Sequence, residues 1–85
     1  MPHIVVKLWT GKGEDLKAQL TEAIVRDVTN ILGSSPGSIS VGFEEVPSED
    51  WTERVYEPDI LNKWDALTKE PGYGPRPSHS KDRPV

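Results

Sequence analysis

An amphipathic stretch at residues 14–32 lies between two short apolar segments and determines the topology that this chain can adopt. Apolar residues recur within it at steps of three and four, which predicts one long helix. Gly33 follows it as a suitable left-handed C-terminal cap. The flanking segments, residues 1–9 and 38–46, alternate apolar positions with mixed ones and are predicted to be strands. A strand, a helix and a strand form a βαβ unit, in which the two strands are parallel and the crossover is right-handed.

The first segment has one face made only of Ile4, Val6 and Leu8, which we expect to pack against helices. Its other face is mixed and suits partial cover by another subunit. That mixed face consists of His3, Val5, Lys7 and Trp9.

The remainder of the chain is less regular. Pro58 interrupts any long helix and fits best in the first turn of a second helix, predicted at about residues 58–69. The last eleven positions are rich in proline and charge, so we predict a domain at residues 1–74 and a flexible, Pro-rich tail at residues 75–85.

Composition narrows the classes of function. A chain of 85 residues makes one small domain that buries only about 60% of its extended surface. It has no cysteine for disulfides, so we expect at least a dimer. The net charge of −4 argues against a nucleic-acid partner. No apolar run approaches the roughly 20 residues of a membrane span, and no leader precedes the first strand, so we expect a cytoplasmic protein without a membrane partner.

Pro2 is the candidate catalytic residue. Removal of Met1, usual before a small residue, would expose the secondary amine of Pro2 at the head of a strand. An α-amino group titrates at about 7.7–8.0 when unperturbed, and burial beside a cation lowers that pKa toward neutrality, as a general base requires. The competing interpretation is chance, because about one residue in twenty is a proline.

The start at Met1-Pro2, the apolar strand, the turn at Gly11-Lys12-Gly13, the long helix and the second parallel strand resemble the 4-oxalocrotonate tautomerase family. The match runs from Pro2 to about Trp51, and the closing Pro71-Gly72-Tyr73 resembles a dimeric bacterial branch of that family. The resemblance implies an α+β fold of the tautomerase/MIF type. In it a βαβ protomer with a second C-terminal helix dimerises into a four-stranded sheet that carries two antiparallel helices.

The resemblance also implies roles for four residues. Pro2 matches the general base of the family, and Lys12 stands in a turn where many members bind the substrate carboxylate with an arginine. Ser40 falls where hexameric members have a second arginine, and Trp51 aligns with an aromatic wall of the pocket. Lysine lacks the bidentate fork of arginine, and serine can donate only a neutral hydrogen bond. Family members interconvert enol and keto forms of small unsaturated 2-oxo or 2-hydroxy acids, such as phenylenolpyruvate or 2-hydroxymuconate, without metal or cofactor.

Two other functions stay open at this stage. Relatives with a terminal proline hydrate or dehalogenate small unsaturated acids, although they use extra arginines that Ser40 does not supply. A non-catalytic dimeric interaction protein could also keep the fold and use its tail for docking. The resemblance favours a homodimer over a hexamer, because the chain extends beyond the shortest members.

Overall fold

The computed structural model describes residues 1–78, which form two compact units. The first unit spans Met1–Ser48, and the second begins at Glu49. The predicted flexible tail at residues 75–85 lies outside the described residues from residue 79 onward.

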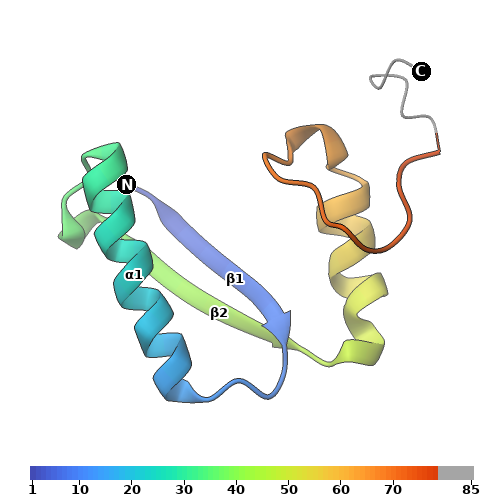
Figure 1. The fold of residues 1–85 in the computed structure, drawn as a ribbon, viewed down its shortest axis with the longest axis horizontal. Coiled ribbons are helices and arrows are strands. Elements are labelled where there is room, and N and C mark those ends of the chain that lie inside the picture. The colour runs from blue at the N-terminus through green and yellow to red at the C-terminus, as the bar shows by residue number, and fades with distance from the viewer. Residues whose placement is uncertain (79–85) are drawn as a thin grey trace. The chain divides into compact units, whose positions relative to one another are not determined.

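The first unit is the predicted βαβ unit (Figure 1). Strand β1 covers His3–Trp9, helix α1 covers Glu14–Leu32 and strand β2 covers Ser40–Val46. The two strands pair in parallel, with His3 opposite Ser40 and Trp9 opposite Val46. The prediction of two parallel strands joined by one long helix is therefore confirmed.

The ends of α1 follow local chemistry. Glu14 and Asp15 occupy its first turn, where carboxylates favour the positive end of the helix dipole. Gly33 ends it at φ 76° and ψ 13°, in the left-handed region, and its N–H donates to the Thr29 carbonyl at 3.1 Å. Strand β2 begins two residues later than predicted, because a 3₁₀ turn, η1, occupies Pro36–Ser38.

The two faces of the small sheet differ in exposure. Ile4, Val6 and Leu8 of β1 are half-buried, whereas Val5 and Trp9 on the opposite face are 49% and 57% exposed. This alternation agrees with the predicted face assignment. Several apolar residues of α1 also remain exposed, namely Leu16, Leu20, Ile31 and Leu32.

The second unit contains a helical segment that differs from the prediction. A π-helix, η3, covers Thr52–Leu61 between two 3₁₀ turns, η2 at Ser48–Asp50 and η4 at Trp64–Ala66. The predicted helix at residues 58–69 was wrong in its bounds, because Pro58 lies inside η3 rather than in a first turn. Proline clashes with the carbonyl four residues before it in an α-helix. Here the winding is wider, as the bond from the Asn62 N–H to the Glu57 carbonyl at 3.0 Å shows.

Residues 70–76 lie against this helical segment through specific contacts. The buried Tyr56 hydroxyl lies 3.1 Å from the Tyr73 carbonyl oxygen and 2.6 Å from that of Pro75. The Arg76 guanidinium lies 5.0 Å from the centre of the Trp64 ring and 3.0 Å from a Glu70 carboxylate oxygen. The second unit thus closes on its own aromatic side chains.

Within residues 1–78, no helix combines the length and the apolar character that a membrane crossing needs.

Candidate active site

Pro2 stands immediately before β1 and is held there by the backbone. Its carbonyl accepts a hydrogen bond from the Ser40 N–H at 3.1 Å, which continues the β1–β2 ladder by one residue. Pro2 is half-buried, whereas Met1 is fully exposed. Because the Met1 side chain packs against nothing in the described chain, its removal would sacrifice no buried contact.

Ser40 contributes a second bond at the same end of the sheet. Its hydroxyl lies 2.6 Å from Nδ1 of His3, the residue directly opposite it in the strand register. Ser40 therefore contacts both Pro2, through its backbone, and His3, through its side chain. Sequence reasoning placed His3 on the mixed face of the first strand and did not foresee this bond. The available signal was the register itself, since each residue lies at the first position of its strand.

Lys12 lies at the other end of the sheet. It follows the C-terminal end of β1, in the turn between β1 and α1, while Pro2 precedes the N-terminal end (Figure 1). Seven residues at about 3.3 Å each separate the two ends by roughly 20 Å. Lys12 is exposed, and within residues 1–78 it makes no hydrogen bond or ion pair. One protomer therefore brings Pro2 and Ser40 together but keeps Lys12 apart from them.

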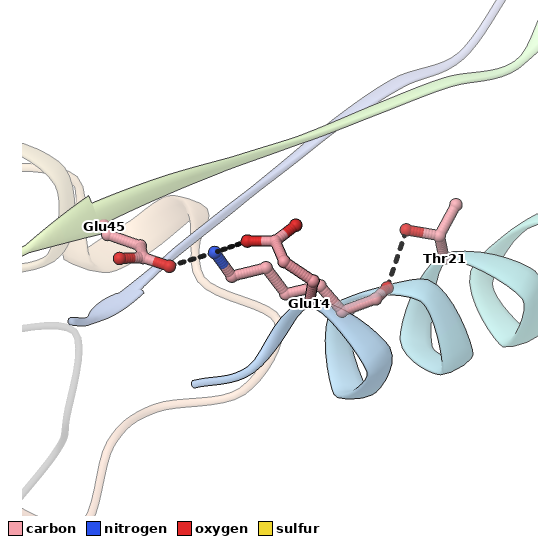
Figure 2. A network of polar contacts seen from close by, with 4 residues as sticks. Glu14, Thr21 and Glu45 are labelled. Carbon is pink, nitrogen blue, oxygen red and sulfur yellow. Dashed lines mark hydrogen bonds and ion pairs between the residues drawn. The ribbon is translucent and has the colours of Figure 1, made fainter. Parts of the chain in front are cut away.

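Lys17 fixes the start of α1 on the sheet, next to the turn that carries Lys12. In Figure 2, the carboxylates of Glu14 and Glu45 both contact one ammonium group, which belongs to Lys17. The Glu14 carboxylate lies 3.3 Å from it, and the Thr21 hydroxyl donates to the Lys17 carbonyl at 2.9 Å. The hydrogen bond to Glu45 raises the pKa of Lys17 above its ordinary value of 10.5; burial opposes this rise, and Glu14 adds to it.

Sequence reasoning missed this ion cluster, although its signal was present. Lys17 interrupts the apolar stripe of α1, and a charge in such a stripe needs a partner on the element that it faces. Glu45 supplies that partner from the helix-facing side of β2.

Trp51 belongs to the second unit, where it directly precedes η3. Its indole N–H donates to the Tyr73 hydroxyl at 3.0 Å. Its assignment as a pocket wall stays a prediction. A shallow groove on the first unit, between Val25 and Thr29 of α1 and Pro36 of η1, includes none of the predicted site residues.

Known proteins provide an independent comparison. No protein-family model matches the chain. A probable tautomerase of Xylella fastidiosa is 40% identical over 74 residues, which cover 87% of this chain and 90% of the relative. Tautomerase PptA of Pectobacterium carotovorum is 38% identical over 86% of this chain and 97% of its own length. Tautomerase PptA of Escherichia coli is 31% identical over 86% and 95%.

A solved structure agrees with these relatives. The crystal structure of YwhB, a homologue of 4-oxalocrotonate tautomerase, superposes with a TM-score of 0.53 and 30% identity, covering 54% of this chain and 75% of that protein. The βαβ fold and the relatives agree on one family. The chain belongs to the 4-oxalocrotonate tautomerase family, and its relatives include PptA tautomerases.

Proposed function

We propose that this protein is a cofactor-independent tautomerase, an isomerase that interconverts enol and keto forms of small unsaturated 2-oxo and 2-hydroxy acids. Pro2, freed by removal of Met1, is the general base. The observation that carries this proposal is the position of Pro2, half-buried and tied by its carbonyl to the Ser40 N–H at the head of the sheet. The bond holds the residue that bears the amine in one place, and the exposed Met1 can be removed without disturbing it.

The reaction requires one group that both accepts and returns a proton. The neutral Pro2 nitrogen takes the proton of the enol hydroxyl, so an O–H bond breaks and an N–H bond forms. The oxygen electrons then form the carbonyl, and the C=C pair takes the proton from the Pro2 nitrogen to make a C–H bond. A donor near the substrate oxygen stabilises the charge that develops there. A positioned proton transfer of this kind contributes about 10²–10⁴ in rate.

Substrate binding requires a second copy of the chain. The substrate is only a few atoms long, while Pro2 and Lys12 of one protomer lie roughly 20 Å apart along β1. If β1 pairs in antiparallel fashion with β1 of a second copy, Lys12 of the partner subunit comes next to Pro2. The resulting homodimer has a four-stranded sheet and two shared sites, in which each Lys12 ammonium anchors the carboxylate.

The surface of the first unit supports this dimer. A two-stranded sheet with one helix is marginal alone, and β1 has one neighbour among the described strands. Val5 and Trp9 of β1 and Leu16 and Leu20 of α1 are exposed. Their burial against a second copy supplies the apolar surroundings that keep the Pro2 amine neutral.

The first experiment compares the wild type with Pro2→Ala, after mass spectrometry has shown that Met1 is absent from both. Ketonisation of phenylenolpyruvate, followed by absorbance, should fall about 10²–10⁴-fold in the variant, because it lacks the positioned base. Circular dichroism should show the same fold. Equal turnover would overturn the assignment, and retention of Met1 would favour a non-catalytic interaction protein, since the amine would then be an amide.

A second experiment tests whether the site is shared. Pro2→Ala and Lys12→Ala proteins should each be weakly active, and a refolded mixture should regain about a quarter of wild-type activity, because half of the dimers are mixed and half of their sites are complete. If both residues acted within one chain, mixing would restore nothing. A monomeric wild-type protein in sedimentation would contradict the shared site directly.

A further inference from the structure

The His3–Ser40 pair lies beside the proposed base without a role in the mechanism above. His3 directly follows Pro2, and consecutive Cα atoms lie about 3.8 Å apart. The 2.6 Å contact joins Nδ1 of His3 to the Ser40 hydroxyl on the exposed side of the sheet. Ser40 is itself fixed, because its N–H donates to the Pro2 carbonyl at 3.1 Å. The imidazole orientation is therefore tied to the residue that carries the base.

This contact engages one ring nitrogen and leaves the other available. Within residues 1–78, Nε2 of the exposed His3 has no hydrogen-bond partner. A neutral imidazole has one N–H donor and one acceptor nitrogen, and the bond made by one nitrogen selects the role of the other. If the serine hydroxyl donates to Nδ1, the proton resides on Nε2, which then faces solvent as a donor. The opposite arrangement would present a lone pair, which repels the acceptor oxygens of an anionic acid.

We propose that His3 is a further substrate-binding residue of this site, and that Ser40 acts through it. The Ser40 hydroxyl donates to Nδ1 and holds the proton on Nε2, and the Nε2–H group donates to the substrate oxygen on which charge develops. This inference rests on the proposed tautomerase function. In this inference, Ser40 positions the imidazole and is not itself the hydrogen-bond donor to the substrate. His3 contacts the substrate and does more than join the first residues of the two strands.

Two amide substitutions distinguish the roles of the two nitrogens. His3→Gln can place an N–H near the position of Nε2, whereas His3→Asn can keep only a polar group near Nδ1. Loss of one oxyanion donor lowers kcat by about 10²–10³, so His3→Asn should lose about 100-fold in kcat while His3→Gln stays within about tenfold of the wild type. A fully active His3→Asn together with an impaired His3→Gln would show a structural role and overturn the proposal.

Ser40→Ala tests whether the serine acts through the histidine. In the wild type it should lower kcat, and in a His3→Ala background it should have no further effect, because the positioning partner is already gone. Losses that multiply in the double variant would show that Ser40 contacts the substrate itself and would contradict its assignment. Thermal unfolding of each variant identifies any loss that comes from the fold.

Nitrogen NMR of the His3 ring gives a readout that does not depend on turnover. In the full chain carrying His79→Gln, a single imidazole should show the proton on Nε2, and phenylpyruvate should shift the Nε2 resonance more than that of Nδ1. A proton on Nδ1, or equal shifts, would overturn the inference. If turnover depends on Pro2 but not on His3, the inference alone fails. If His3 responds to the ligand while Pro2→Ala keeps full activity, the proposed base fails.

Discussion

The two units of the chain differ in how backbone regularity relates to burial. The first unit holds both strands and the long helix, yet none of the described residues of α1 is fully buried. The second unit has only a π-helix and short turns, yet it contains three of the four buried apolar residues within residues 1–78, namely Val55, Tyr56 and Trp64; the fourth is Val46 of β2. In this chain, regular backbone hydrogen bonding therefore does not coincide with the burial of apolar side chains. In our proposal the first unit completes its core by pairing with a second copy, whereas the second closes on its own side chains.

Gly74 is the position at which a single substitution should destabilise the second unit most. It has φ +80°, and a Cβ there would lie 2.6 Å from Cζ of Tyr56, whose ring is buried. Gly74→Ala combines the left-handed backbone cost with overpacking, so we expect a loss of about 2–4 kcal/mol in the free energy of unfolding. Urea denaturation measures this loss. Hydrogen exchange should show it first at the amides of η3.

Gly33→Ala is the matched control in the first unit. Gly33 has a similar φ of +76°, but a Cβ added there would have nothing within 4 Å. The substitution should therefore cost only the backbone strain, about 1–2 kcal/mol. Equal losses at the two glycines would show that the Tyr56 contact does not constrain the second unit.

The two units also differ in how well the sequence predicted their secondary structure. The bounds of α1, Glu14–Leu32, agree with the prediction because a repeat of 3.6 residues and a terminal glycine are both local signals. The extent of η3 was wrong because its signal is not local. Pro58 suggested a helix start, whereas the segment packs with residues up to 19 positions away through Tyr56 and Pro75. Periodicity does not encode such side-chain contacts with backbone carbonyls.

Tyr56→Phe sharpens the comparison by removing one hydroxyl and almost no volume. The Tyr73 and Pro75 carbonyls lose their contact with that hydroxyl, so we expect the free energy of unfolding to fall by about 1–2 kcal/mol. Tyr73→Phe is the control, since among residues 1–78 the Tyr73 hydroxyl accepts only the exposed bond from Trp51, and its loss should matter less. If both variants unfold at the wild-type urea concentration, neither hydroxyl contributes to holding residues 70–76 in place.

The candidate site likewise combines features that can be predicted from the local sequence with features that depend on contacts between residues far apart in the chain. Pro2 and Lys12 were found by their places in a motif, and the strand register explains why Ser40 lies beside Pro2. The His3–Ser40 bond appears only once the strands are placed side by side, whereas the extended length of β1 alone separates Pro2 from Lys12. A motif read along the chain therefore identified residues, but the parallel pairing of β1 and β2 determines which of them one protomer brings together.

The smallest expected effect concerns Lys17, the charge that ties α1 to β2 in the first unit. Its pKa is raised in the folded state, chiefly by the hydrogen bond to Glu45, so its stabilising contribution is fully present below its ordinary pKa of 10.5. The contribution is lost as the pH rises above that value through the folded-state pKa.

The difference in Tm between the wild type and Lys17→Met should accordingly be constant from pH 8 to about 10 and shrink at higher pH. Glu45→Gln should weaken this pH dependence, because the hydrogen bond to Glu45 is the main cause of the raised pKa of Lys17. A Tm difference that stays level through pH 12 would mean that Lys17 stabilises the first unit by packing its aliphatic stem rather than by its charge.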